Sequence, residues 1–174
     1  MLIADQIIEL LSLEPLPGEG GWYRETYKSS TSIPGAALPT QGAERSCSTQ
    51  IYYLLRSGAV SALHRVKSDE VFHHYMGDPV TQLRVDPEGR AEVVVIGQDI
   101  TIGQRPQVVV PAGWWQGAIM TADLEGNADA FALMGCTVSP GFEWDDFELV
   151  QPDRIYPEFQ HARSAFEWFD RLLA

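Results

Sequence analysis

The side chains best suited to chemistry lie in one short stretch of this 174-residue chain. His64 is followed after a short interval by Glu70 and then by His74. An imidazole that accepts a proton near neutral pH, set beside a carboxylate, can act as a general base or help to bind a metal ion. These three side chains are therefore the first candidates for a functional site.

Strand geometry predicts how these side chains point. Residues 67–69 predict a hairpin turn, which places Glu70 opposite Val66 on the returning strand. Because alternate residues of a strand share a face, Glu70 and His74 lie on the same side, and His64 lies on the same side as Val66. If this face lines the interior of the domain, His64, Glu70 and His74 converge.

The rest of the sequence predicts an all-β domain with a short helix near each end. Apolar residues at helical spacing predict helices over residues 2–12 and 164–173, whereas residues 29–45, rich in Ser, Thr, Pro and Gly, predict a loop. Short β-rich runs separated by turn residues predict strands at residues 22–27, 49–56, 60–66, 70–76, 80–85, 91–96, 107–110, 117–120, 130–138 and 146–150. Many short strands without helices between them are typical of an antiparallel barrel or a double-sheet jelly roll.

Composition limits the classes of partner. The chain has 24 acidic and 12 basic side chains, and its net charge of −12 repels nucleic-acid phosphates and anionic lipid. We therefore expect neither a nucleic-acid partner nor a membrane. The length and the 45% hydrophobic content predict a single domain over residues 1–174. Because Cys47 and Cys136 are too few for a disulfide framework and the N-terminus does not resemble an export signal, we expect a cytoplasmic protein.

Two groups of residues resemble a known superfamily. Gly58, His64, Glu70 and Gly77 have the spacing of the first half of the cupin signature, and residues 111–116 resemble the second half. Longer strings resemble one branch, the cupin-5 family of unknown function, at residues 16–27, 61–66, 69–75, 110–118 and 139–149. The resemblance implies a cupin β-barrel, or double-stranded β-helix, with its core at residues 20–150. It also implies a central cavity for a small-molecule ligand and, frequently, a homodimer.

The resemblance to metal-binding cupins is incomplete. Their usual site binds iron, manganese or nickel with three histidines and one carboxylate, and on this chain only His64 and Glu70 match. Val66 and Gln116 stand where two of the histidines are expected. His74 is a possible replacement, which gives a set of His64, Glu70, His74 and Gln116 for a divalent transition metal. Because Val66 cannot ligate and an amide oxygen binds such an ion more weakly than imidazole does, we expect that no cofactor is required.

A second resemblance, to cupin-fold sugar-nucleotide epimerases, implies acid–base chemistry without a metal. Those enzymes carry Gly-Leu-His, with the histidine as base, and a late Trp-x-Asp-Pro whose aspartate orients it. This chain has Ala-Leu-His at residues 62–64 and Trp-Asp-Asp at residues 144–146, without the proline. The match implies that His64 and Asp146 are catalytic, with Asp146 accepting a hydrogen bond from His64 and fixing its tautomer.

The residues expected to contact a substrate are polar or aromatic. By strand alternation one of Trp114 and Trp115 lines the cavity and the other the outer layer, and Trp115 is our candidate, with core packing as the alternative. Arg24 is a candidate clamp for an anionic group, with a surface ion pair as the alternative. Tyr53 and Tyr75 are both available as proton donors. The predicted substrate contacts are Glu70, His74, Gln116, Trp115, Arg24 and Tyr53.

Three functions follow from these residues. The preferred hypothesis is a metal-independent epimerase or isomerase of a sugar-like or polar carbonyl metabolite, with His64 as the base. The second is a metal-dependent oxygenase or hydrolase, and the third is a ligand-binding or storage-like barrel without catalysis. The sequence identifies neither the substrate nor its pathway.

Overall fold

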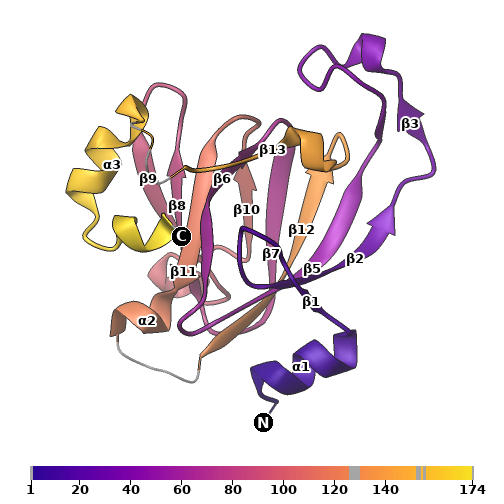
Figure 1. The fold of residues 1–174 in the computed structure, drawn as a ribbon. Coiled ribbons are helices and arrows are strands. Elements are labelled where there is room, and N and C mark those ends of the chain that lie inside the picture. Colours follow the sequence, from indigo (N-terminus) through magenta and orange to yellow (C-terminus); the bar gives the residue numbers. More distant parts are fainter. Residues whose placement is uncertain (1, 126–129, 152–153, 155, 174) are drawn as a thin grey trace.

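Two antiparallel β-sheets lie face to face in the computed structural model of this chain, which describes residues 2–125, 130–151, 154 and 156–173 (Figure 1). The first sheet has, in spatial order, β1 (Glu14–Pro15), β2 (Trp22–Lys28), β5 (Thr49–Arg56), β12 (Phe131–Ser139), β7 (Asp69–Gly77) and β10 (Gln107–Val110). The second sheet has β13 (Phe147–Leu149), β6 (Val60–Val66), β11 (Trp115–Met120), β8 (Val80–Val85) and β9 (Ala91–Ile96). The predicted double-sheet, all-β fold is confirmed, with strand bounds close to those expected.

Glycine is required at several of the turns between these strands. Gly77 ends β7 with φ +94, and a Cβ at this position would lie 2.1 Å from the carbonyl oxygen of Phe131 on the neighbouring strand. Only a residue without a side chain adopts this backbone conformation and tolerates this close approach.

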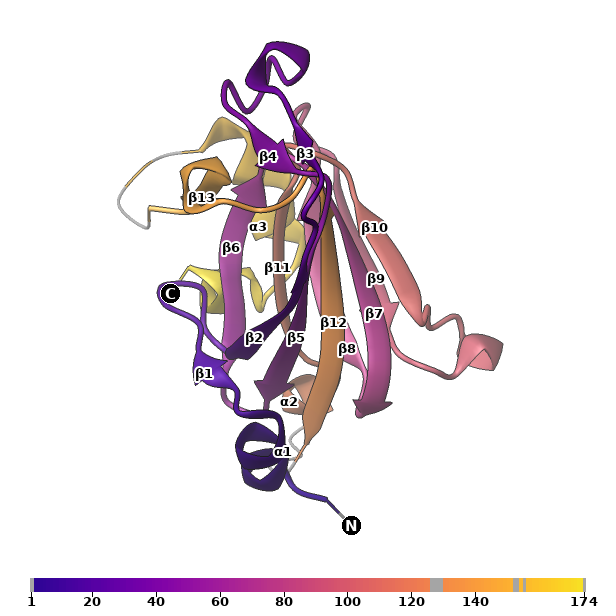
Figure 2. The ribbon, with the colours of Figure 1, turned by 90° about the vertical axis from the view of Figure 1, so that its right-hand side faces the viewer.

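The predicted hairpin at residues 67–69 is wrong. β6 belongs to the second sheet and β7 to the first, so the chain crosses from one sheet to the other at this corner (Figure 2). Val66 pairs with Phe147 of β13, and Glu70 pairs with Val138 of β12 and with Val110. Side chains of β6 and β7 therefore meet across the interior of the barrel instead of side by side within one sheet.

Helices cover the outside of the barrel. The α-helices are α1 (Ala4–Leu11), α2 (Thr121–Glu125) and α3 (Gln160–Ala165), and the 3₁₀ helices are η1 (Gly35–Ala37), η2 (Ile100–Ile102), η3 (Trp144–Asp146), η4 (Pro157–Phe159) and η5 (Phe169–Leu172). The helix predicted at the N-terminus is confirmed. The prediction of a short helix near the C-terminus is confirmed, but its bounds of 164–173 are wrong, because α3 ends at Ala165 and extended backbone at Phe166 (φ −124, ψ 107) separates it from η5. The predicted loop at residues 29–45 carries η1 and a small sheet of β3 (Ser32–Ile33) and β4 (Arg45–Ser46).

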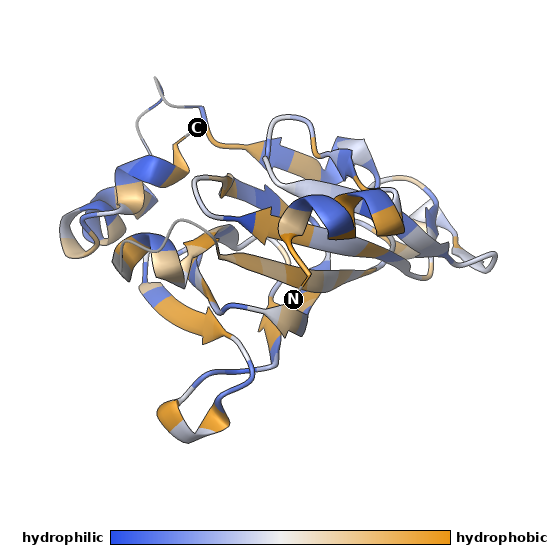
Figure 3. Ribbon diagram, turned by 90° about the horizontal axis from the view of Figure 1, so that it is seen from below, coloured by the Kyte–Doolittle hydropathy of each residue, from blue (hydrophilic) through white to orange (hydrophobic). Residues whose placement is uncertain are grey.

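Apolar side chains form three clusters, one between the sheets and two outside them. Tyr53, Phe72, Met120 and Met134 belong to the cluster between the sheets. Outside the second sheet, Leu63, Trp115 and Ile119 pack against the C-terminal helices through Phe159, Phe169 and Leu172. Outside the first sheet, Ile7 of α1 packs with Leu54 and Leu133. Figure 3 shows hydrophobic and hydrophilic residues together on α1, as expected for a helix with one buried face.

The helices within the described residues are all too short or too polar to span a lipid bilayer.

Candidate active site

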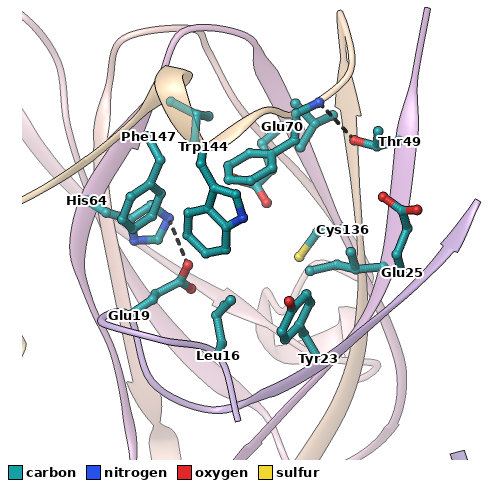
Figure 4. Close-up of a pocket in the computed structure, with 14 residues that line it drawn as sticks. Leu16, Glu19, Tyr23, Glu25, Thr49, His64, Glu70, Cys136, Trp144 and Phe147 are labelled. Atoms are coloured by element: carbon teal, nitrogen blue, oxygen red, sulfur yellow. Dashed lines mark hydrogen bonds and ion pairs between the residues drawn. The ribbon is translucent and has the colours of Figure 1, made fainter. Parts of the chain in front are cut away.

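A cavity of about 80 Å³ lies between the two sheets, beside the segment that joins β1 to β2 (Figure 4). Two of its lining residues are exposed, Glu25 and Trp144, and they mark its mouth. The lining residues that can ionise are Glu19, Tyr23, Glu25, His64, Glu70 and Cys136. The other lining residues are mainly apolar: Leu16, Thr49, Ile51, Val66, Val138, Phe142, Trp144 and Phe147. The cavity therefore combines an apolar wall with a few groups capable of proton transfer.

His64 is buried on the inner face of β6, with 2% of its surface exposed. Its Nδ1 lies 2.7 Å from the carbonyl oxygen of Ala62, which can only accept a hydrogen bond, so Nδ1 carries a proton. In the neutral ring Nε2 then holds the lone pair, and it lies 3.7 Å from Oε2 of Glu19. Phe147 stacks on the ring, with 5.2 Å between the centroids. The backbone thus fixes the tautomer of His64 and directs Nε2 toward Glu19 at the cavity.

Glu19 is the acidic partner of His64. Its Oε1 accepts a hydrogen bond of 2.7 Å from Oγ of Ser61, and its main-chain oxygen accepts one of 2.8 Å from the amide of Ala62. The neighbouring Gly20 has φ +98, and a Cβ there would lie 2.4 Å from the carbonyl oxygen of Val60. Glycine at this position lets the β1–β2 segment lie against β6, which brings the Glu19 carboxylate to the ring of His64.

Glu70 is the second carboxylate of the cavity, and it is 7% exposed. Gln116 donates a hydrogen bond of 2.6 Å from Nε2 to Oε2 of Glu70, while Oε1 of Gln116 faces Nε2 of Gln82 at 3.4 Å. Burial raises the pKa of Glu70 above its ordinary value, and the attraction of His64 only partly opposes this shift. Glu19 raises the pKa of Glu70 further. Glu70 is therefore shifted toward its neutral acid form, which can donate a proton.

Cys136 lies close to Glu70 on the inner face of β12. Burial raises the pKa of the Cys136 thiol well above its ordinary value, and the negative charges of Glu70 and Glu19 add to the shift. Because the thiolate is the reactive form of cysteine, this residue is a small apolar wall of the cavity and not a nucleophile.

Aromatic rings form the mouth of the cavity. Phe142, Trp144 and Phe147 contact one another edge to face, with centroid separations of 5.3, 6.3 and 5.7 Å. Trp144 is 50% exposed, whereas Phe147 reaches inward to stack on His64. Figure 4 shows Trp144 and Phe147 on the His64 side of the cavity, with Tyr23 and Glu25 on the other. A ligand that enters the cavity passes these rings.

The predicted contact between Asp146 and His64 is wrong. Asp146 instead accepts hydrogen bonds of 2.7 and 2.9 Å from Nε and Nη2 of Arg45, and Lys67 lies 3.4 Å away. Burial alone would raise the pKa of Asp146, but the hydrogen bonds and charges of Arg45 and Lys67 hold it below its ordinary value. Asp146 thus connects η3 to β4, and the carboxylate that lies beside His64 belongs to Glu19.

His74 shares the inner face of β7 with Glu70, as predicted, but it does not converge with Glu70 and His64. A strand rises roughly 3.3 Å per residue, so His74 lies about 13 Å beyond Glu70 along β7. Its Nε2 lies 3.1 Å from the carbonyl oxygen of Asp78, and its Nδ1 is buried without a hydrogen-bond partner in the described structure. A shared strand face places side chains on one side of a sheet, but not at one depth.

The other predicted substrate contacts are divided between the inside and the outside of the barrel. Gln116 faces inward and reaches the site through Glu70. Trp115 faces outward into the cluster with the C-terminal helices and has Arg65 over its ring at 4.6 Å, while Trp114 packs against the inner cluster. The two tryptophans face opposite ways, as alternation predicts, but neither lines the cavity, so the choice of Trp115 for the cavity is wrong. Arg24 is exposed on β2, between the cavity-lining Tyr23 and Glu25.

Neither tyrosine predicted as a proton donor lies in the cavity wall. The hydroxyl of Tyr53 donates a hydrogen bond of 3.1 Å to the carbonyl oxygen of Gly20, and burial raises its pKa well above the ordinary value. Tyr75 lies on the opposite face of β7, where its ring stacks on His73 at 6.5 Å and meets Tyr52 edge to face. Tyr53 therefore supports the β1–β2 segment, and Tyr75 belongs to the outer surface.

Glu19, Tyr23, Glu25 and the aromatic rings at the mouth were not predicted as site residues. The available signal was the glycine-rich string at residues 18–21, which lies within the cupin-5-like string at residues 16–27. A charged residue between glycines that themselves pack closely against a strand has a fixed position, and that marks Glu19 as a site residue.

Comparison with known proteins agrees with this architecture. The sequence pattern of the family described as Cupin superfamily (DUF985) matches residues 5–150, most of the chain. The chain belongs to this cupin family. The resemblance predicted from the two-part signature is thereby confirmed.

Among solved structures, this cupin is similar to protein SO0799 from Shewanella oneidensis, with 35% identity and a TM-score of 0.83 over 100% of this chain and 99% of the other. It is also similar to a hypothetical protein from Leishmania major, with 30% identity and a TM-score of 0.81 over 94% and 96% of the two chains. The uncharacterized yeast protein YML079W is 27% identical over 139 residues, which are 76% of this chain and 68% of the yeast protein.

The donor set of this cupin does not fit the metal that the fold often binds. Val66 lines the cavity at a position where a ligating cupin has histidine, and it offers only methyl groups. The amide nitrogen of Gln116 is turned toward Glu70, so its oxygen faces Gln82 and not the cavity. Within the described residues, His, Cys, Asp and Glu form no group of three or more arranged to hold a metal ion. The cavity therefore offers proton-transfer groups in place of a ligand cage.

Proposed function

We propose that this cupin is an enzyme that moves a proton at a carbon next to a carbonyl group, as an epimerase or isomerase of a small polar metabolite does. The observation that carries the proposal is His64, a buried imidazole whose tautomer is fixed by the Ala62 carbonyl and whose Nε2 is directed to a cavity. A neutral imidazole held in one tautomer is an effective general base near neutral pH.

In the proposed reaction Nε2 of His64 takes the proton from the carbon next to the carbonyl. The electron pair of the broken C–H bond forms a carbon–carbon double bond, and the carbonyl oxygen becomes the oxygen of an enol. Glu70, which burial shifts toward its acid form, supplies a proton to this oxygen. In an isomerisation, His64 returns its proton to the former carbonyl carbon of the enediol, and the hydroxyl on the other carbon gives its proton to the Glu70 carboxylate and becomes the new carbonyl. In an epimerisation, water delivers a proton to the opposite face of the original carbon, the enol oxygen returns its proton to Glu70, and His64 releases its proton to solvent.

Glu19 acts on this reaction through His64. The imidazole gains a positive charge when it accepts the proton, and the Glu19 carboxylate at 3.7 Å stabilises that charge. Ser61 holds this carboxylate in place by its hydrogen bond of 2.7 Å. Glu19 is therefore a positioning residue, and His64 and Glu70 are the catalytic ones.

The size of the cavity supports a small substrate. A buried water needs roughly 10–15 Å³ on the same measure of volume, so the cavity of about 80 Å³ holds a compound of only a few non-hydrogen atoms, or one ring of a larger molecule. A nucleotide attached to such a ring would lie outside the mouth.

Deuterium exchange tests the proposal. Hydroxyacetone in D₂O should lose its proton signals next to the carbonyl faster with the protein than in buffer, as followed by proton NMR. His64→Leu should lower the protein-dependent rate by about 10²- to 10⁴-fold, because the general base is lost. The control, His161→Leu, removes an exposed histidine from α3 and should keep the rate. Equal rates for the wild type and His64→Leu would contradict the proposal.

A chelator separates this proposal from the metal-dependent alternative. Treatment with EDTA, followed by removal of the chelator, should leave the exchange rate unchanged, because none of the proposed steps uses a metal. Loss of exchange that is restored by a first-row transition metal would favour a metal-dependent oxygenase or hydrolase instead.

A further inference from the structure

The fixed charges that line the cavity all have the same sign. Glu19 and Glu25 are its charged lining residues, since burial shifts Glu70 toward its neutral acid form, and neither lysine nor arginine belongs to the wall formed by the described residues. Arg24 and Lys28 of β2 lie outside this wall, and Lys28 is held by Glu143 at 2.7 Å. An anionic group would therefore meet carboxylates without a balancing cation, which is unfavourable in a partly buried site.

The apolar part of the wall has the composition of a site for organic cations. Phe142, Trp144, Phe147 and Tyr23 line the same cavity, and three of these rings pack edge to face. Aromatic faces attract ammonium groups through the negative potential above the ring, and aromatic cages combined with carboxylates recognise such ligands. The half-exposed ring of Trp144 is the one that an entering ligand meets at the mouth.

One buried polar atom is directed into the same space. His64 has 2% of its surface exposed, and among the described residues its Nε2 has one contact, the charge contact to Glu19 at 3.7 Å, which exceeds hydrogen-bond distance. The cavity thus offers a ligand one nitrogen without a hydrogen bond, carboxylates on both sides and aromatic faces. These observations are independent of one another and agree on the chemistry of the ligand.

We infer that the cavity takes a small substrate that carries a positively charged amino group as well as the reacting carbonyl. The inference rests on the proposed function, because it names the substrate class for the same site. The ammonium group lies between the carboxylates and the aromatic rings, and the carbonyl lies toward His64 and Glu70. A cationic group near the carbonyl also makes the neighbouring C–H bond more acidic, which favours the proton transfer to His64.

Three compounds of nearly equal size test this inference. Aminoacetone is cationic, hydroxyacetone is its neutral counterpart, and pyruvate is the anionic one; binding of each to the full chain is measured by titration calorimetry at neutral pH. Aminoacetone should bind about ten-fold more tightly than hydroxyacetone, because charge-assisted contacts are roughly twice as strong as neutral ones, and pyruvate should bind most weakly. Binding of hydroxyacetone or pyruvate as tight as that of aminoacetone, or failure of aminoacetone to bind, would overturn the inference.

Variants at the mouth locate the charge. Glu25→Gln should weaken aminoacetone binding by up to about five-fold and leave hydroxyacetone binding unchanged, because Glu25 is exposed and its charge is partly screened. Glu167→Gln removes an equal charge from the exposed C-terminal region and should change neither affinity. Trp144→Leu should weaken aminoacetone binding by about two- to five-fold, and Trp144→Phe should restore most of it, because phenylalanine retains an aromatic face. If Glu25→Gln weakened hydroxyacetone binding as much as aminoacetone binding, this result would also contradict the inference.

The binding and exchange experiments distinguish failure of the inferred substrate class from failure of the proposed function. If aminoacetone binds tightly but the protein does not accelerate its deuterium exchange, the substrate class stands and the proposed function is wrong. If hydroxyacetone exchanges rapidly and binds as tightly as aminoacetone, the proposed function stands and the substrate class is wrong.

Discussion

β7 and β12 each contribute inner-facing side chains to two different parts of the barrel interior. In the first part, Glu70 and Val138 line a cavity with His64. In the second part, further along the same strand faces, Phe72 and Met134 belong to a filled apolar cluster. The difference lies in side-chain volume and polarity, because the backbone alternation is the same in both parts.

The two parts therefore separate the side chains that stabilise the barrel from those that could take part in chemistry. Large apolar side chains fill space and stabilise the fold through their packing contacts, whereas the residues around a cavity make fewer such contacts. The cavity part also holds buried groups that are costly without partners, and each has a specific one: Ser61 for Glu19, Gln116 for Glu70 and the Ala62 carbonyl for His64. We therefore expect substitutions in the two parts to separate activity from stability.

The largest expected effect on stability comes from Asp146, at the edge of the cavity part. Arg45 and Asp146 have side chains only 5% and 2% exposed, so Asp146→Ala leaves the Arg45 charge buried without its main partner. We expect a decrease of about 3–5 kcal/mol in the free energy of unfolding, measured by urea denaturation. The folded fraction should retain its deuterium exchange, because Asp146 contacts Arg45 and not His64.

The matched control for this prediction is Glu148→Ala. Glu148 also pairs with an arginine, Arg65 at 2.6 Å, but both side chains are more than one third exposed. Its loss should cost less than about 1 kcal/mol. If folded Asp146→Ala lost its deuterium exchange to the same extent as His64→Leu, our assignment would be wrong. Asp146 would then be the residue that orients His64.

The architecture followed from the sequence more readily than the site did. Turn residues and alternation predict strands locally, so the bounds of β5, β6 and β8 agree with the structure. Which strands pair is a long-range property, and for this reason residues 67–69 looked like a hairpin although they join two sheets. Position on a strand face is also local, but depth in the barrel is not, which explains the error at His74.

The partners of His64 could not be predicted for the same physical reason. Glu19 reaches the site from a segment between strands, and its position depends on the close approach of Gly20 to Val60. Arg45, the partner of Asp146, lies in a stretch that the composition marks only as a loop. Motif resemblance singled out His64, which lines the cavity, but the carboxylate beside its ring belongs to Glu19 and not to Asp146.

A smaller effect should appear in the pH dependence of stability through Glu70. Its pKa is raised in the folded state, first by burial, so the folded protein binds a proton that the unfolded chain has already released. The stability contributed by the protonated form is complete below the unfolded pKa, near the ordinary value of 4.5, and is lost as pH rises through the folded pKa. Between about pH 4 and pH 7, the wild type should therefore lose stability relative to Glu70→Gln.

Urea denaturation of both proteins across this pH range measures the difference. Subtracting the variant cancels groups such as Asp146, whose lowered pKa gives the opposite pH dependence. Glu167→Gln, which removes an exposed carboxylate, should show the same change in the free energy of unfolding with pH as the wild type. A wild type that instead gains stability over Glu70→Gln as pH rises would mean that Glu70 is held as a charged carboxylate and is not the proton donor.

The smallest effect is expected in the filled part of the barrel, at His74. His74→Leu removes the hydrogen bond to the Asp78 carbonyl, which costs about 1 kcal/mol, but it also removes the buried Nδ1 that has no partner, which returns a similar amount. We therefore expect the free energy of unfolding to change by less than about 1 kcal/mol and the exchange rate to be retained. His64→Leu, the same substitution in the cavity part, should lose the exchange. If His74→Leu also lost the exchange in a folded protein, the two parts of the interior would form one functional site, because the contacts of His74 among the described residues involve neither His64 nor Glu19.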